Sequence, residues 1–143
     1  MGGVANYRYE RVRDTPLYDT SVENDVEDVD LGVYVDAAVV VSAVTIGELA
    51  YGVGAGDRAA RELRLRRILA DYEVAPFGVE EAKLYGVLAE LVRIAGRHPR
   101  PGRLDLQIAA TAAAARIPLL TMNPDDFLGV APLVDVVPIR RAG

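Results

Sequence analysis

The sequence contains no cysteine, no tryptophan and only one histidine, His98. The lack of cysteine excludes disulfides and thiolate metal sites, and a single histidine excludes metal sites built from several histidines. The lack of cysteine also fits a reducing compartment, so we expect the protein to be cytoplasmic. A metal site in this chain would therefore depend on oxygen ligands.

Long hydrophobic runs and a positive charge excess are also missing. The longest apolar run, Ala37–Val41, is far too short to cross a membrane, and the first residues lack the apolar core of a signal peptide. The formal net charge is −5, with 21 acidic and 16 basic residues. This charge argues against a broad surface that coats RNA. It does not argue against a nuclease, whose metal site needs clustered carboxylates.

The length of 143 residues suits one domain. We see no internal repeat and no linker. Residues 1–16 are polar and irregular and are predicted to be an N-terminal extension, and residues 17–143 are predicted to form the domain. A domain of this size buries roughly two thirds of the surface of its unfolded chain, so it needs no disulfide or structural metal to fold.

Strand and helix patterns alternate along the chain. Short apolar runs predict strands that end at Asp19 and that span 38–42, 73–77, 117–121 and 134–139. Helices are predicted from a Thr45 cap to about Gly52, and over 57–72, 80–96 and 104–116, with Ala60, Leu63 and Leu69 as core positions of the second. The acidic segment 23–36 fits neither pattern. The alternation predicts an α/β fold with a central, mainly parallel five-stranded sheet flanked by helices.

Acidic residues follow the predicted strands. Asp19 ends the first strand, Glu48 lies early in the next helix, Asp105 opens the alanine-rich helix, and Asp125 and Asp126 follow the fourth strand. Ligands of such sheets bind beyond the carboxyl ends of the strands. Carboxylates that converge there repel one another unless a cation such as Mg²⁺, which prefers oxygen ligands, lies between them.

Each acid also has a purely local explanation. Asp19 can cap a helix, Asp105 is favourable near a helix N-terminus, Glu48 fits a capping box with Thr45, and Asp126 suits a turn. Spacing alone leaves the choice between these roles and a metal site open.

Four segments resemble the motifs of PIN-domain toxins. They are Leu17–Val22, Val41–Leu49, Asp105–Ala112 and Pro118–Phe127, and they occur in the order typical of the family. The resemblance extends from about Leu17 to Ile139. It implies a sheet of five parallel strands and the toxin half of a VapBC-type type II toxin–antitoxin pair.

The resemblance also implies a site and a chemistry. Asp19, Glu48, Asp105 and Asp126 take the catalytic and metal-binding places, with Mg²⁺, or alternatively Mn²⁺, as the cofactor. Asn123 stands where the wider family often has its fourth acid, and Asp126 is preferred to Asp125. The implied activity is endoribonuclease cleavage of RNA. The implied protein partners are a cognate VapB-like antitoxin and a second copy of the chain.

Thr20 and Thr121 are expected to support the acids through their hydroxyls. Two rival functions remain. A phosphatase of the haloacid dehalogenase type would need an acid two residues after Asp19, where Ser21 stands. A non-catalytic PIN-like module that binds RNA or protein would be expected to have an incomplete set of acids.

Two groups of arginines are prominent. Arg58, Arg61, Arg64, Arg66 and Arg67 crowd one predicted helix, and Arg97, Arg100 and Arg103 crowd the loop before Asp105. We interpret the helical group as a solvated face. The loop group is expected to lie beside the acids and to contact RNA phosphates. His98 is interpreted as a loop residue rather than a general base.

Overall fold

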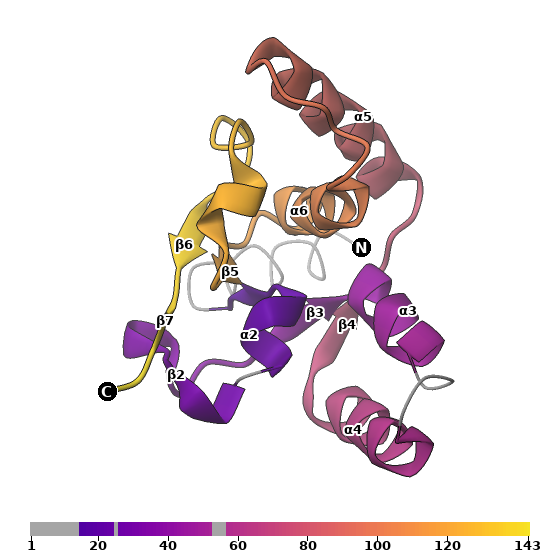
Figure 1. Ribbon diagram of the computed structural model, residues 1–143, viewed down its shortest axis with the longest axis vertical. Coiled ribbons are helices and arrows are strands. Elements are labelled where there is room, and N and C mark those ends of the chain that lie inside the picture. Colours follow the sequence, from indigo (N-terminus) through magenta and orange to yellow (C-terminus); the bar gives the residue numbers. More distant parts are fainter. Residues whose placement is uncertain (1–14, 25, 53–56) are drawn as a thin grey trace, which may run out of the picture.

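The computed structural model describes residues 15–24, 26–52 and 57–143, and its centre is a five-stranded parallel sheet (Figure 1). Its strands are β1 (Leu17–Tyr18), β3 (Val40–Ser42), β4 (Glu73–Ala75), β5 (Leu119–Thr121) and β6 (Val136–Pro138), in the order β4-β3-β1-β5-β6. Every pairing in this sheet is parallel. The predicted α/β fold with five parallel strands is confirmed. Residues 1–14 of the predicted extension lie outside the described residues.

Helices cover both faces of the sheet. They are α2 (Thr20–Asn24), α3 (Ala43–Gly52), α4 (Arg58–Asp71), α5 (Val79–Ile94) and α6 (Arg103–Ala115), with 3₁₀ turns at Val26–Asp28, Gly32–Tyr34 and Pro124–Phe127 (η4). Figure 1 shows α5 and α6 on one side of the sheet and α2 and α4 on the other. Among the described residues, no helix combines the length and the apolar character needed to span a membrane.

The three central strands are buried on both faces, which explains their continuous apolar sequence. Side chains alternate between the faces of a strand, so each central strand contributes one residue to each of two cores. Leu17, Val40 and Leu119 pack beneath α5 and α6. Tyr18, Val41 and Leu120 pack on the opposite face, with Val22 of α2 and Ile68 of α4.

The predicted core positions of α4 are wrong. Ala60 is exposed, and Leu63 and Leu69 are 57% and 51% exposed, whereas Ile68 is 3% exposed. The face of α4 that meets the sheet contains Ile68 and the partly buried Leu65. Because a helix turns once in 3.6 residues, Leu63 and Leu69 point away from that face.

The predicted start of α3 is also wrong. The helix begins at Ala43, and its cap is Ser42, whose Oγ accepts a 3.0 Å hydrogen bond from the backbone N–H of Val44. Thr45 lies inside the helix and is fully buried. By contrast, the helix predicted over 57–72 begins where expected, and Asp57 caps it, because its Oδ1 accepts from the backbone N–H of Ala60 at 3.1 Å.

The acidic segment 23–36 contains one strand of a second, two-stranded sheet, which was not predicted. Strand β2 (Val29–Asp30) pairs antiparallel with β7 (Arg140–Arg141), which follows β6 closely. The register places Asp30 opposite Arg140. Opposite charges at paired positions favour such a ladder, and Asp30 Oδ1 also accepts from the backbone N–H of Gly32 at 2.9 Å.

Candidate active site

Asp19 is the most firmly held of the predicted acids. It follows β1 directly, is 4% exposed, and its backbone N–H donates to the carbonyl of Leu120 at 2.9 Å. Its Oδ1 accepts from the backbone N–H of Thr20, and its Oδ2 accepts from Ser21 Oγ and Thr121 Oγ1, each at 2.8 Å. Hydrogen bonds to a carboxylate are strong, so this side chain is fixed at the carboxyl edge of the sheet.

The same two hydroxyls position the segment after β5. Ser21 Oγ accepts from the backbone N–H of Met122 at 3.1 Å, and Thr121 Oγ1 accepts from the backbone N–H of Asn123 at 3.0 Å. The described contacts of Asn123 with this network therefore use its backbone. Ser21 occupies the place where the phosphatase rival needs an acid, and here its hydroxyl anchors Asp19.

Glu48 extends from α3 toward the same edge. Its Oε1 accepts a 3.2 Å hydrogen bond from Thr20 Oγ1, which also lies 3.3 Å from Thr45 Oγ1. Burial raises the pKa of Glu48, and the nearby charge of Asp19 raises it further, whereas the Thr20 hydrogen bond lowers it. The carboxylates of Glu48 and Asp19 therefore interact, with Thr20 in contact with both residues.

Asp105, in the first turn of α6, shows that all four acids lie near one another. Its pKa is raised from 3.8 to about 6, first by burial and then by the charges of Asp19, Asp126 and Glu48. Asp126 belongs to η4, after β5. Its neighbour Asp125 is not among the charges that act on Asp105.

These residues fit a magnesium ion better than a closed metal cage. Within the described ranges, no three His, Cys, Asp or Glu side chains are arranged to hold one ion together, although the charges of four acids interact. Mg²⁺ is usually bound by one or two carboxylates and keeps several waters. A cation between the acids would also relieve the repulsion that raises the pKa of Asp105.

Thr20 and Thr121 support the acids as predicted from the sequence, whereas the contacts of Ser21 and Thr45 and a buried hydroxyl pair beneath the site were not predicted. Ser42 Oγ and Thr111 Oγ1 lie 2.9 Å apart, and Thr111 Oγ1 donates to the carbonyl of Gln107 at 2.9 Å. This pair joins the start of α3, which contains Glu48, to α6, which contains Asp105. One sequence signal could have revealed these hydroxyls. Strands β3 and β5 each end in a hydroxyl residue, Ser42 and Thr121, and each is followed by one of the acids.

A cavity of about 460 Å³ opens beside the acids. Both Asp105 and Asp126 line it, together with Arg97 and His98 of the loop between α5 and α6. The predicted position of the arginine loop next to the acids therefore agrees with the structure for Arg97. Neither Arg100 nor Arg103 lines this cavity.

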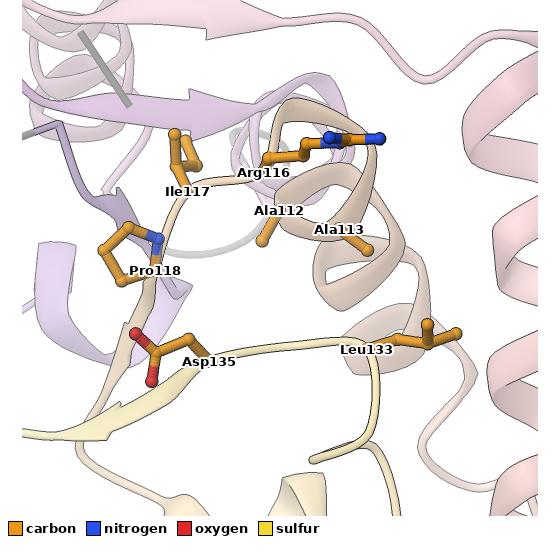
Figure 2. Close-up of a pocket in the computed structure, with 7 residues that line it drawn as sticks. All are labelled: Ala112, Ala113, Arg116, Ile117, Pro118, Leu133 and Asp135. Carbon is orange, nitrogen blue, oxygen red and sulfur yellow. The ribbon is translucent and has the colours of Figure 1, made fainter. Parts of the chain in front are cut away.

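A second cavity, of about 470 Å³, lies at the opposite edge of the sheet (Figure 2). It is bordered by the end of α6 and by residues that precede β5 and β6, including Arg116, Pro118 and Asp135. In Figure 2 the side chains of Arg116 and Asp135 point away from each other. Asp135 is the one carboxylate among its lining residues, so this cavity does not gather the predicted acids.

Comparison with known proteins agrees with this fold. The family model for the PIN domain matches residues 10–131, and the chain belongs to the PIN domain family. No curated protein matches the sequence significantly.

Solved structures from toxin–antitoxin systems resemble the chain closely. VapBC-5 from Mycobacterium tuberculosis, a member of the VapBC family of toxin–antitoxin systems, is 32% identical, with 89% of this chain and 98% of that chain covered and a TM-score of 0.72. VapBC2 from Rickettsia felis, bound to a DNA fragment from its promoter, is 21% identical, with 87% and 98% covered and a TM-score of 0.70. VapBC-1 from nontypeable Haemophilus influenzae is 20% identical, with 87% and 97% covered and a TM-score of 0.67. The latter two show the shared fold, and the first supports the predicted resemblance to VapBC toxins.

Proposed function

We propose that this protein is the toxin of a type II toxin–antitoxin pair and acts as a Mg²⁺-dependent endoribonuclease. The observation that carries the proposal is the convergence of the charges of Asp19, Glu48 and Asp126 on Asp105 at the carboxyl edge of the sheet. The membership in the PIN domain family and the 32% identity to a VapBC system support it.

Asp19 and Asp105 would hold the cation, Mg²⁺ or Mn²⁺, and Glu48 and Asp126 would complete its surroundings through water or a second ion. Such a cation polarises the scissile phosphate and activates water for hydrolysis. Hydrogen bonds from the chain hold the side chains of Asp19 and Glu48 in place. Ser21 and Thr121 both donate to Asp19 Oδ2, whereas Oδ1 accepts from one donor only. Oδ1 is therefore the oxygen better able to bind the cation.

The catalytic test uses substitutions that keep the shape of the side chain. Asp19→Asn and Asp105→Asn are each expected to abolish cleavage of a labelled single-stranded RNA in Mg²⁺, with the circular dichroism spectrum unchanged. Asp135→Asn, at the opposite edge of the sheet, is the matched control and should cleave normally. Full activity in either site variant, after removal of contaminating nucleases, would refute the site. Wild-type protein that binds RNA without cleaving it would support the non-catalytic module instead.

A toxin of this kind needs an antitoxin that holds it inactive, and two surfaces suit one. Helices α3 and α4 expose Tyr51 (91%), Leu63 (57%) and Leu69 (51%) to solvent, which suits an amphipathic segment of the antitoxin. The site carboxylates suit an arginine or lysine from its tail, which would bind in place of the cation.

Mg²⁺ titrated into the purified toxin–antitoxin complex should then restore RNA cleavage, with ionic strength held constant. Inhibition that is indifferent to Mg²⁺, and to loss of every basic residue in the antitoxin tail, would indicate steric blocking away from the acids.

The second protein partner we propose is another copy of the chain. Val87 and Ile94 are 48% and 74% exposed on α5 and lie seven residues apart, close to two helical turns. A homodimer that buries this face should dissociate when Val87 and Ile94 are both replaced by lysine. Sedimentation of the wild type as a monomer at micromolar concentration would contradict this proposal.

A further inference from the structure

The cavity beside the acids has a composite wall. One side is the loop after α5, which contributes Arg97 and His98, and the other is η4 and its flank, which contribute Asp126 and Leu128. Its apolar lining includes Val92 and Leu106, which are 7% and 3% exposed. We call this cavity the loop–η4 pocket.

The two sides of the loop–η4 pocket are held together by a close contact. Gly129 has φ +95, and a Cβ at this position would lie 3.4 Å from the Cβ of Ala95 and 3.6 Å from the carbonyl oxygen of Leu91. On the other side, Gly96 has φ +83, and the backbone N–H of Arg97 donates to the carbonyl of Val92 at 3.0 Å. The backbone that forms the pocket is therefore fixed before any ligand binds.

Arg97 is available to a ligand. Within the described part of the chain, Arg58, Arg64 and Arg93 form ion pairs with glutamates, whereas Arg97 forms none. Leu128, on the opposite side, is apolar and 49% exposed. The loop–η4 pocket thus offers a cationic group and an apolar surface directly beside Asp105 and Asp126.

We propose that the loop–η4 pocket holds one nucleotide of a single-stranded RNA, adjacent to the scissile phosphate. Its backbone phosphate lies against Arg97, and its base lies against Leu128 and the apolar lining. This inference rests on the proposed function, because it names the substrate position beside the same acids. A volume of about 460 Å³ is within the range of roughly 300–1,000 Å³ typical of small-ligand sites. A base must be unstacked to enter it, which selects single strands over duplexes.

A cationic antitoxin tail is the competing occupant, and the observations favour RNA. Asp105 and Asp126 would attract such a tail, but Arg97 would repel it. An RNA nucleotide satisfies Arg97 and the apolar surface together. The charge of its phosphate near the acids is balanced by the cation that the proposed function already requires.

The test measures RNA binding by fluorescence anisotropy, with Ca²⁺, which also takes oxygen ligands, in place of Mg²⁺ and at several salt concentrations, and cleavage in Mg²⁺. Products of the wild-type reaction first locate the scissile bond. Oligonucleotides that lack the base on either side of that bond are then compared with intact RNA. Arg97→Ala is paired with Arg100→Ala, a change in the same loop outside the pocket. Leu128→Ala is paired with Leu104→Ala, since Leu104 is 43% exposed and does not line the pocket.

Arg97→Ala should reduce the slope of log affinity against log salt by about 0.7, the effect of one lost phosphate contact on a single strand. Leu128→Ala should weaken binding of intact RNA about tenfold, within the range for loss of a base contact. Leu128→Ala should leave unchanged the binding of the abasic RNA that lacks the base held in the pocket, because that RNA has no base for Leu128 to contact. Arg100→Ala and Leu104→Ala should change neither quantity.

Equal effects in the paired variants, or equal losses on intact and both abasic RNAs, would overturn the pocket assignment. Unchanged RNA affinity with weaker antitoxin affinity would assign the pocket to the antitoxin and also overturn it. Tight, variant-sensitive binding without cleavage in Mg²⁺ would refute the proposed nuclease but support the pocket. RNA cleavage in Mg²⁺ together with RNA binding that Arg97→Ala and Leu128→Ala leave unchanged would support the proposed nuclease but refute the pocket.

Discussion

Replacing Asp105 by asparagine is expected to make the metal-free protein more stable at neutral pH, although the change removes a proposed metal ligand. The pKa of Asp105 is raised from 3.8 to about 6, by burial first and by the charges of Asp19, Asp126 and Glu48 next. The folded protein therefore binds this proton more tightly than the unfolded chain does. By linkage, the free energy of unfolding decreases as the pH rises from about 4 to about 6 and stays lower above that.

The size of the effect follows from the pKa difference. A change from 3.8 to about 6 corresponds to at most about 3 kcal/mol, at 1.36 kcal/mol for each pH unit. Asp105 is only half-buried, so solvent screening reduces this figure. Its place in the first turn of α6 also favours a negative charge there. We expect Asp105→Asn to add about 1–2 kcal/mol above pH 7 and close to nothing at pH 4.

Urea denaturation in EDTA, at pH values from 4 to 8, measures this difference directly. Asp125→Asn is the matched control, because Asp125 is exposed and does not act on Asp105, and its stability should follow that of the wild type. A variant no more stable than the wild type at pH 7.5 would show that the acids do not repel one another as described. A gain of equal size at every pH would point to a cause other than the charge.

Three further outcomes are expected. Mg²⁺ or Mn²⁺ at 100 times its dissociation constant should add about 2.7 kcal/mol to the free energy of unfolding. Thermal melts with and without metal measure this gain, and an equal gain in a variant with both Asp19 and Asp105 replaced would place the ion elsewhere. Thr121→Val removes a 2.8 Å hydrogen bond to buried Asp19 and the 3.0 Å bond from the backbone N–H of Asn123 and should lower stability in urea by about 1.5–3 kcal/mol, whereas a loss below about 0.5 kcal/mol would mean that the two bonds together contribute little. Gly129→Ala forces an L side chain to φ +95 with its Cβ 3.4 Å from the nearest side chain and should cost about 1–2 kcal/mol, measured as a lower Tm. Gly86→Ala, in a helix with nothing within 4 Å, should instead stabilise the protein by up to about 1 kcal/mol, and equal effects of the two changes would contradict the strain at Gly129.

The central sheet was predictable because burial on both faces leaves a strong trace in the sequence. Runs such as Val40–Val41 and Leu119–Leu120 are short and apolar on both faces, which separates buried strands from amphipathic helices. The position of Asp19 was predictable for a related reason. Parallel strands bring their carboxyl ends to one edge, so an acid that ends a strand must lie at that edge.

Features set by tertiary packing were not predictable in the same way. The buried face of α4 depends on how that helix lies against the sheet, so the leucines chosen from local spacing proved to be exposed. The pairing of β2 with β7 joins residues about 110 positions apart, and no local pattern indicates it. The Thr121 hydroxyl meets Asp19 across 102 positions, and Ser21 Oγ meets the backbone N–H of Met122 across 101. Their roles became visible only with the fold.

The central place of β1 determines when the four acids can come together during synthesis. This strand is made first, yet it pairs on one side with Val40–Val41 and on the other with Leu119–Leu120. Asp19 gains its Thr121 hydrogen bond, and Asp105 its neighbour Asp126, only after most of the chain has been translated. Pairings this distant in sequence also form slowly. The four acids therefore come together only after the segment 119–126 has been made and has folded against β1.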